Sequence, residues 1–340
     1  MSSTTWVGGD SGNETDWATG ANWSTGSPPT TSAHVVIANT GHNCALDQTR
    51  TIGSLTIQAS ATIVGGGNKL IIQSEGDASG GTEHYALKND GIVSGNLHLE
   101  FTYAGETAAD FNGSSGNFND IKLNAASVDL NQVGVATFDS LIIVANSTYD
   151  AGNDGLTISG DVSCTGNFFG NATSAVSHGS LTVNSGGTYK ATSGTTTITS
   201  NTATGTRSVY NNGGTFTHNN GTLKINTSSN TNYDFDGDDL YNFTVECENG
   251  SGAVQCDGET STAVTVLNDL DIKMGILRTN INSFTIHGNV FVRETSLTNK
   301  NKFVAQGANQ TVKGLITVED GAFFDMQNQG SGSFGRLTTG

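Results

Sequence analysis

Hydrophobic residues recur along this chain in short alternating runs, not at helical spacing. A repeated unit places a hydrophobic residue before one or two small polar residues, followed by a hydrophobic–x–hydrophobic triplet. Because successive side chains of a strand point to opposite faces, this period of two predicts β-strands with one buried face. The clear copies are IGSLTI (52–57), FNDIKL (118–123), FDSLII (138–143), LYNFTV (240–245), LNDLDI (267–272) and INSFTI (281–286).

The spacing of these units predicts how the strands are assembled. One unit cannot bury its apolar side alone, but units stacked on their neighbours can, as in coils of roughly 20–25 residues. The segment SLTVNSGGTYKATSGTTTITSN (180–201) reads as one such coil, with three short strands separated by SGG and TSG. The sequence therefore predicts an all-β, elongated β-solenoid (a parallel β-helix) with almost no helix.

A β-sandwich or jelly-roll of one or two domains is the alternative fold, since alternation and turn signals suit it too. Three observations favour the solenoid. The chain has only two prolines, the strand unit recurs at coil-like spacing, and the hydrophobic content is low at 34%. A low hydrophobic content is expected when the core is a thin column and not a sphere.

The first tenth of the chain differs in composition from the rest. It contains every tryptophan and every proline, namely Trp6, Trp17, Trp23, Pro28 and Pro29. A solenoid exposes the backbone edge of its first coil, and such an edge needs a cap. Bulky indoles and a Pro-Pro bend supply apolar area without free backbone donors.

We therefore divide the chain into two parts. Residues 1–37 are predicted to form an N-terminal cap or docking segment, with VVI (35–37) as the first core strand. Residues 38–340 are predicted to form the solenoid, and the pattern leaves room for further coils beyond residue 340. The reason for this last expectation is that no cap is visible in the sequence before the final LTTG.

Charge and composition exclude several classes of partner. The net charge is −17, from 31 acidic and 14 basic residues. Binding to nucleic acid or to an anionic membrane needs Lys and Arg, so neither partner is expected. The opening MSSTTWVGG has neither the charged nor the apolar region of a signal peptide. No stretch approaches the about 18 apolar residues of a membrane span, so membrane insertion is not expected.

Four cysteines offer two interpretations. Their spacing is not that of a metal site, and no CxxC occurs. Cys247 and Cys256 flank a turn signal and would be able to form a disulfide across a hairpin. The simpler interpretation, which we favour, is that Cys44, Cys164, Cys247 and Cys256 are small buried hydrophobic residues.

The strongest metal candidate is the stretch YDFDGDDLYNF (233–243). Asp234, Asp236 and Asp238 alternate there, and hard carboxylate oxygens in a bend suit Ca²⁺. The spacing is not that of an EF-hand loop, and a solvated turn is the default interpretation. The stretches 147–155 and 74–84 are weaker candidates of the same kind. No other cofactor is indicated.

Enzymatic chemistry has only weak candidates in the sequence. Glycoside hydrolysis needs two carboxylates about 5–9 Å apart, which neighbouring coils of a solenoid would supply. The residues Asp120, Asp139, Asp269 and Asp271 sit in or just before repeat strands, but the repeat itself explains Asp at a bend. His98 and His287 alternate with apolar residues and should therefore face outward. We expect no enzymatic activity.

One resemblance adds to this interpretation. The N-terminal pattern resembles the opening of β-helical virion structural proteins of tailed bacteriophages, particularly marine ones, and also resembles repeats in autotransporter passenger regions. The later F-[ND]-x-[LIF]-x-[VIL] units are similar in style to the same phage proteins. The residues that carry the resemblance are Trp6, Gly8, Trp17, Asn22, Trp23, Gly26, Pro28, Val35 and Ile37.

The resemblance implies a structural, non-enzymatic role on the surface of a virion. The expected part is a tail fibre or spike, or a capsid-decorating fibre, with an adhesive role. The implied partners are other copies of the chain, as a homotrimer, other virion proteins and a host surface glycan. A bacterial cell-surface adhesin or extracellular filament protein, and a polysaccharide-degrading tailspike, are the alternatives. An autotransporter would need a signal peptide and a C-terminal membrane domain, and neither is visible here.

Overall fold

The protein is described here from a computed structural model. It describes residues 2–74, 85–103, 109–113, 116–125, 127–171, 174–247, 255–258, 263–294, 301–306, 309–326 and 331–339. Among these residues there is no α-helix, and one short 3-10 turn, η1 (Gly20–Asn22), is the only helical element. The predicted near-absence of helix is confirmed. No helix in the described part is long and apolar enough to cross a membrane.

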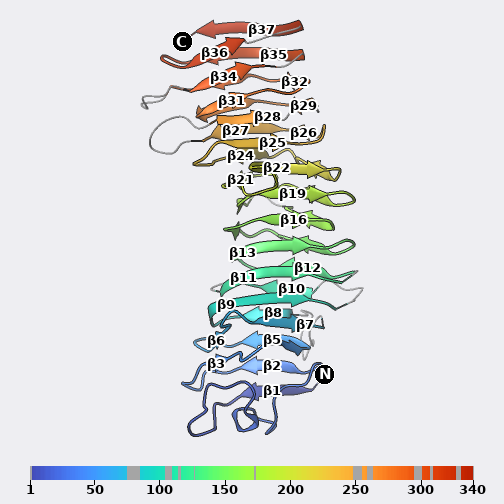
Figure 1. Cartoon of the computed structure of the whole chain (residues 1–340), viewed down its shortest axis with the longest axis vertical. Helices are drawn as coiled ribbons and strands as arrows, with labels where there is room; N and C mark the ends of the chain where they lie inside the picture. Colours follow the sequence, from blue (N-terminus) through green and yellow to red (C-terminus); the bar gives the residue numbers. More distant parts are fainter. Residues whose placement is uncertain are drawn as a thin grey trace. The chain divides into compact units, whose positions relative to one another are not determined.

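The chain divides into two compact units. Unit 1 comprises Met1–Ser159 with Gly166–Phe169, and unit 2 comprises Gly160–Thr165 with Gly170–Gly340. Within each unit, the strands of successive coils pair in parallel (Figure 1). A sandwich or jelly-roll is built from antiparallel strands. The parallel β-helix predicted from the sequence is therefore confirmed.

In unit 1 the strands form three stacks. The first contains β1 (Ser3–Trp6), β2 (His34–Ile37), β5 (Ser54–Ile57), β8 (Tyr85–Asn89), β10 (Ala109–Asn112), β12 (Asp129–Gln132), β14 (Thr148–Asp150) and β17 (Asn167–Phe169). The second contains β3 (Cys44–Ala45), β6 (Thr62–Val64), β9 (Ile92–Phe101), β11 (Gly116–Leu123), β13 (Ala136–Ile143) and β15 (Leu156–Ile158). The third contains β4 (Arg50–Ile52), β7 (Lys69–Ile72) and the later parts of β9, β11 and β13.

Unit 2 repeats the arrangement. Its first stack contains β16 (Val162–Cys164), β19 (Leu181–Asn184), β22 (Arg207–Asn212), β25 (Thr231–Asp234), β28 (Gln255–Gly258), β31 (Ile276–Arg278), β34 (Lys302–Ala305) and β36 (Phe323–Met326). The second contains β18 (Val176–His178), β21 (Thr195–Ile198), β24 (Thr222–Ile225), β27 (Asn242–Glu246), β30 (Leu270–Met274), β33 (Val290–Val292), β35 (Asn309–Val318) and β37 (Ser331–Thr339). The third contains β20 (Thr188–Lys190), paired with β23 (Thr215–Thr217), and the run β26 (Asp239–Leu240), β29 (Ala263–Val266), β32 (Ser283–Ile286).

The coils vary in length because the loops between strands vary. Asp161 and Ser180 are hydrogen-bonded neighbours 19 residues apart, whereas Thr279 and Gln306 are neighbours 27 residues apart. The predicted coil 180–201 is present, with its three strands as β19, β20 and β21. Each repeat unit found in the sequence forms or overlaps a strand, and the alternating hydrophobic residues of these strands are buried.

Aromatic rings line the interior of unit 1 in series. Centroids of successive rings lie 6.0 to 6.3 Å apart along the series Phe101, Phe111, Phe138, Tyr149 and Phe168. The last two rings are nearly parallel, at 5°. Such contacts add about 0.5–1.5 kcal/mol per pair to the free energy of area burial. The Tyr149–Phe168 contact follows from the parallel register, which pairs these two residues on β14 and β17, whereas the other three contacts join rings from different stacks across the core.

Outward side chains of successive coils are linked by ion pairs and hydrogen bonds. In unit 1, Lys69 Nζ lies 2.6 Å from Glu100 Oε2, and Asn124 donates to the other oxygen of Glu100. Polar contacts of this kind keep the outer face of each stack solvated.

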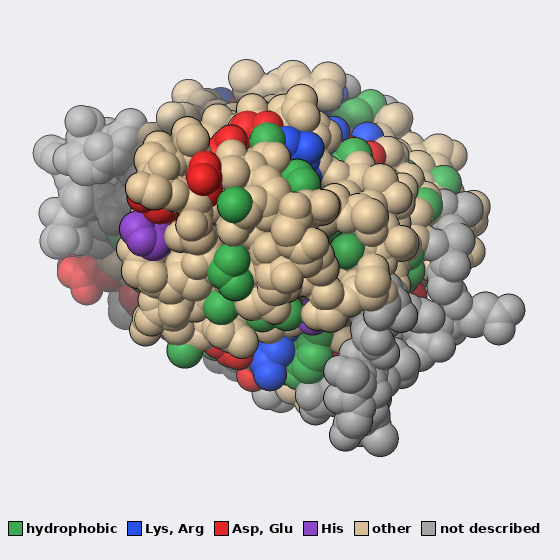
Figure 2. Space-filling model, turned by 90° about the horizontal axis from the view of Figure 1, so that it is seen from below, with side chains coloured by type: hydrophobic (Ala, Val, Ile, Leu, Met, Phe, Trp, Pro, Cys, Tyr) green, Lys and Arg blue, Asp and Glu red, His purple; other side chains and the backbone are tan. Residues whose placement is uncertain are grey.

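Figure 2 views the molecule from the side of β1. Most of that surface is backbone or uncharged polar side chains, and hydrophobic side chains appear only in small separate patches.

A histidine lies inside the core of unit 2. His178 on β18 is fully buried and shares a hydrogen bond of 2.8 Å with the Tyr189 hydroxyl. Burial disfavours the charged imidazolium and lowers the pKa of His178 to about 4, although a backbone hydrogen bond at Ser180 and the charge of Asp161 act in the opposite direction. His178 is therefore a neutral core residue at ordinary pH.

This burial predicts a loss of stability in mild acid. The unfolded chain protonates His178 near pH 6.5 and the folded chain only near pH 4, so the free energy of unfolding falls as pH is lowered between them. The loss from this group should reach about 3 kcal/mol below pH 4, at about 1.36 kcal/mol per pKa unit. Denaturant unfolding at several pH values measures it. His178→Gln, which keeps a partner for Tyr189, should lack this component, and an unchanged pH profile would contradict the assignment.

Candidate functional site

The N-terminal segment covers the free edge of β1. Ser24 donates its backbone N–H to the Thr5 carbonyl at 2.9 Å, and Val7 donates to the Asn22 carbonyl at 2.8 Å. Trp6 and Trp23 form an antiparallel bridge. The backbone groups that β1 would otherwise expose to another chain are therefore used within the protein, which is the function of a cap.

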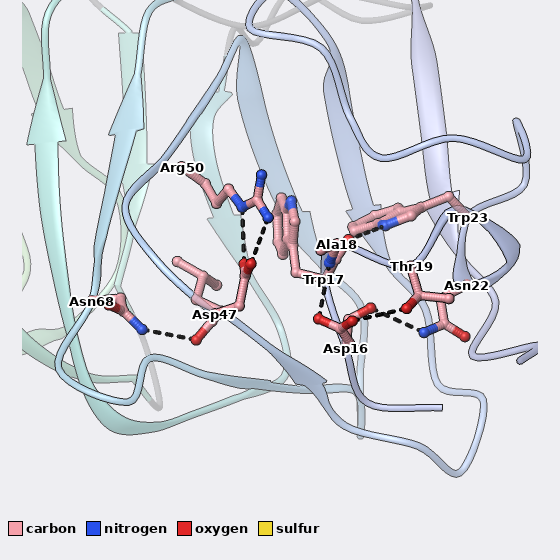
Figure 3. A network of polar contacts seen from close by, with 10 residues as sticks. Asp16, Trp17, Ala18, Thr19, Asn22, Trp23, Asp47, Arg50 and Asn68 are labelled. Carbon is pink, nitrogen blue, oxygen red and sulfur yellow. Dashed lines mark hydrogen bonds and ion pairs between the residues drawn. The ribbon is translucent and has the colours of Figure 1, made fainter. Parts of the chain in front are cut away.

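The three indoles form one buried cluster. Trp6, Trp17 and Trp23 are 0%, 1% and 2% exposed. Trp23 packs edge-on against both others, with ring centroids 5.1 Å from Trp6 and 4.7 Å from Trp17. Its indole Nε1–H donates to the Trp17 carbonyl at 2.8 Å (Figure 3). Side chains placed in this way stabilise the cap and do not present a surface to a partner.

Asn22 holds the loop beneath the indoles. It is fully buried, and its amide nitrogen donates to the carbonyls of Asn13 and Asp16 while its oxygen accepts from the Asp10 N–H. The carboxylate of Asp16 accepts in turn from Thr19 Oγ1 at 2.8 Å (Figure 3). In the sequence, Asn22 stood out only as part of the N-terminal motif. Its position directly before Trp23 was the one sign that it holds the cap loop.

One detail of the sequence-based boundary is wrong. We expected residues 35–37 to be the first core strand, but β1 precedes them and pairs with β2 in register, with Trp6 beside Ile37. The alternation of Thr4 and Trp6, both buried, is too short to be recognised as a strand without its partner. Pro28 and Pro29 are half-buried in the loop that leads to β2.

The aspartates proposed for Ca²⁺ are used by the fold in different ways. Asp234 Oδ1 accepts from the Asp236 N–H at 3.0 Å, a bond within the turn. Asp238 Oδ2 accepts from the Phe216 N–H and from Asn211 Nδ2, at 2.6 and 2.8 Å. Burial raises the pKa of Asp238, and the bond from Phe216 opposes this shift. Across the described ranges, no group of three or more His, Cys, Asp or Glu side chains is placed to hold a metal ion.

The two weaker acidic stretches differ in what the structure describes. Within 147–155, Asp150 accepts from the Gly152 N–H and Asp154 from the Gly134 N–H, at 2.8 and 2.9 Å. The stretch 74–84 lies outside the described residues except for Ser74.

Of the four aspartates considered for catalysis, two lie in unit 1 and two lie in unit 2. In unit 1, Asp120 lies 2.8 Å from His98 Nδ1 and accepts from Ser140 Oγ, while Asp139 accepts from Ser159 Oγ. These contacts join neighbouring coils. As predicted, His98 and His287 face outward, and Lys313 contacts His287 at 3.0 Å.

Asp269 and Asp271 lie together in unit 2, on the wall of a groove of about 240 Å³. The groove crosses the outer face of the second stack, over strands β24, β27, β30 and β33. Its lining side chains are Thr222, Asn242, Thr244, Asp269, Asp271, Phe291 and Arg293. The sequence identified the two aspartates, but the other five residues come from coils whose alignment only the structure supplies.

A short side chain between longer ones creates the hollow. Parallel register places Thr244 of β27 beside Lys224 of β24 on one side and Asp271 of β30 on the other. Phe291 of β33 follows Asp271 in the same line. Thr244 lies at the floor and is only 7% exposed. Its hydroxyl makes no hydrogen bond with any residue in the described part of the chain.

The wall of the groove that contains Asp271 and Phe291 is fixed by the ion pairs of Arg293. Arg293 donates from Nε to Asp271 Oδ1 at 2.8 Å and from Nη1 to Glu319 Oε1 at 3.1 Å. Its guanidinium carbon lies 4.4 Å from the centroid of the Phe291 ring. The hydrogen bond to Asp271 is the main reason that the pKa of Arg293 is raised. Asp271 is thus neutralised in place, and the Phe291 ring is fixed beside it.

Asn242 and Asp269 form the opposite end. The Asn242 carbonyl oxygen accepts from Asn268 Nδ2 at 2.8 Å and from the Asp269 N–H at 3.3 Å. Asp269 Oδ1 accepts from the Asn289 N–H at 2.7 Å. The Asn242 amide nitrogen and the second Asp269 oxygen have no partner among the described residues. The groove therefore offers a fixed donor, a fixed acceptor and the hydroxyl of Thr244.

The four cysteines are buried, and none of them is in a disulfide. The favoured interpretation, small buried hydrophobic residues, agrees with this finding. Cys247 and Cys256 nevertheless contact one another. A hydrogen bond from Cys256 lowers the pKa of Cys247, and burial raises the pKa of Cys256.

No protein-family model, curated protein or solved structure matches this chain. The likeness to virion proteins therefore rests on the N-terminal motif and the repeat alone. Four of the nine residues of that motif are explained by the cap itself, since Trp6, Trp17, Asn22 and Trp23 are all buried.

We predict that Trp23→Ala destabilises the cap. Removing a buried indole that packs against two others should lower the free energy of unfolding by about 3–5 kcal/mol and expose apolar surface. Thermal unfolding and binding of a hydrophobic dye measure both effects. Val7→Ala, at a 40% exposed side chain of the same segment, is the control and should change little. An unchanged melting temperature for Trp23→Ala would contradict the cap.

We also predict that the thiols are protected. All four sulfurs are buried, so a thiol reagent such as dithionitrobenzoate should react with none in the native protein and with all four after unfolding in guanidinium. Spectrophotometric titration counts them. Recovery of only two thiols from unfolded, unreduced protein would instead show one disulfide, for which Cys247 and Cys256, which contact one another, are the expected pair.

Proposed function

We propose that this protein is a non-enzymatic structural protein of a bacteriophage virion, acting as a tail fibre or spike or as a capsid-decorating fibre with an adhesive surface. The observation that carries the proposal is the combination of parallel coils with a sealed N-terminal edge. Such coils hydrogen-bond to their neighbours along whole strands, and the buried indole cluster protects the first of them.

The outer faces support an adhesive role. Each stack presents in-register polar side chains from successive coils, about 4.8 Å apart, which suits contact with an extended ligand. Ion pairs such as Lys69–Glu100 and Arg293–Asp271 hold these side chains in place across coils. The N-terminal motif adds the likeness to phage virion proteins. Other virion proteins, further copies of this chain and a host glycan are the partners that we propose.

A polysaccharide-degrading spike is the second candidate, because Asp269 and Asp271 both line the groove of unit 2. The arrangement fits binding better than hydrolysis, since Arg293 already engages both oxygens of Asp271. Loss of viscosity in a polysaccharide solution incubated with the protein, abolished by Asp269→Ala, would favour the enzyme.

The location is tested by electron microscopy of the native source material labelled with an antibody to this chain. We expect label on tail tips or on capsid faces, and the position would distinguish a tail fibre from a capsid fibre. Label on cell envelopes or on loose filaments would overturn the virion proposal in favour of a bacterial surface adhesin. Antibody that has first been absorbed with the pure protein should give no label, which controls for specificity.

A further inference from the structure

We infer that the groove of unit 2 is a binding site for a neutral oligosaccharide. This inference rests on the adhesive role proposed above and names the ligand class and the residues of one site. The groove is lined by Thr222, Asn242, Thr244, Asp269, Asp271, Phe291 and Arg293.

The hydroxyl of Thr244 is the first reason. The side chain lies in the groove and is only 7% exposed, and its hydroxyl has no partner among the described residues. A threonine hydroxyl donates one hydrogen bond and accepts others, so hydroxyl groups of a ligand can pair with it in either direction. The groove therefore presents one polar group that a hydroxyl-bearing ligand or solvent would pair.

The neighbouring polar atoms match vicinal hydroxyl groups. Asn242 presents an amide donor and Asp269 a carboxylate acceptor, and each is fixed because its other polar atom is already bonded. A sugar carries several hydroxyls at fixed spacing, each both donor and acceptor. A site with a fixed donor and a fixed acceptor selects such a ligand because ligands without these hydroxyls leave both groups unpaired.

Charge excludes the competing ligand classes. The lining carries two carboxylates and one guanidinium, and Arg293 is also shared with Glu319 outside the groove. A chain of net charge −17 adds repulsion for any anion. A metal ion would need more convergent ligands than the two aspartates, of which Asp271 is paired with Arg293. A neutral, hydroxyl-rich ligand remains.

Phe291 supplies an apolar wall. The ring lines the groove and is held in place by the Arg293 guanidinium at 4.4 Å. The C–H faces of pyranose rings are apolar, so a sugar ring can bury one face against an aromatic wall while its hydroxyls meet polar groups. Rigid walls reduce the entropy lost on binding.

The direction of the groove favours an oligomer over a single sugar. Its lining comes from four successive coils, β24, β27, β30 and β33, which cover about 14 Å at about 4.8 Å per strand. An extended chain of a few sugar units lying across the strands would contact all four coils. A single ring would reach only part of the lining.

The test uses the full chain and defined probes. Cellotetraose, maltotetraose and mannotetraose are the neutral probes, tetragalacturonate is the anionic probe, and CaCl₂ alone is the cation probe. Isothermal titration measures affinity, and NMR of threonine methyl groups shows whether Thr244 is contacted. We expect at least one neutral tetrasaccharide to bind and to shift the Thr244 methyl signal, with no such effect from tetragalacturonate or CaCl₂.

Matched variants assign the site. Thr244→Val removes the hydroxyl with little change of shape and should weaken the neutral probe about tenfold, as expected for one lost hydrogen bond. Thr244→Tyr should fill the groove and abolish binding. Thr285→Val, on an outward position of β32 outside the groove, is the control and should bind as the parent does. Thermal unfolding checks that each variant is folded.

The outcomes separate this inference from the proposed function. The assignment of the groove as the sugar site would be overturned if neither Thr244→Val nor Thr244→Tyr changed sugar binding. It would also be overturned if none of the three neutral tetrasaccharides bound. A Thr244 shift caused by CaCl₂ alone would identify a cation site instead. In each of these cases, antibody label on virions would still support the structural role. Conversely, groove-dependent sugar binding with label on cell envelopes would support the site and overturn the virion proposal.

Discussion

The parallel hydrogen-bond ladder between successive coils is the constraint on which this protein depends. In such a ladder each strand pairs with the equivalent strand of the next coil, so every inward position lies over another inward position. Val35, Leu55 and Leu87 show this alignment in unit 1, and Phe243 and Leu270 show it in unit 2. Tyr149 then stacks on Phe168, and Tyr189 on Phe216, and the core stays apolar even though the chain as a whole is poor in hydrophobic residues.

The ladder also has an edge at β1, on the side away from β2. The chain meets this constraint with a loop that returns beneath β1, bonds its edge and packs three indoles against one another. Asn22 bonds three backbone groups of that loop, so the cap combines a large apolar area with hydrogen bonds that hold the loop in place. The concentration of every tryptophan in the first 23 residues thus has a structural cause.

The same ladder determines what faces outward. Register brings Thr244 between Lys224 and Asp271 and places Phe291 next in line, although these residues are far apart in sequence. The groove is a consequence of one short side chain among longer ones, fixed by the Arg293 ion pairs. Loops can therefore change in length and composition while the strands keep a scaffold on which surface sites are formed.

Local sequence indicated the tryptophan cap. It also encodes the positions of most strands and the solenoid fold. It does so through the alternation of hydrophobic residues and through residues that tolerate turns. For that reason FNDIKL and FDSLII predicted β11 and β13 from the sequence alone. The strand β1 was missed because four residues carry too little periodicity without the partner β2. The residues that contact Asp120, Asp238 and Asp271 from neighbouring coils were also not predictable from the sequence. Coils of unequal length decide which residues meet across the ladder, and those lengths are set by loops whose paths only the tertiary structure defines.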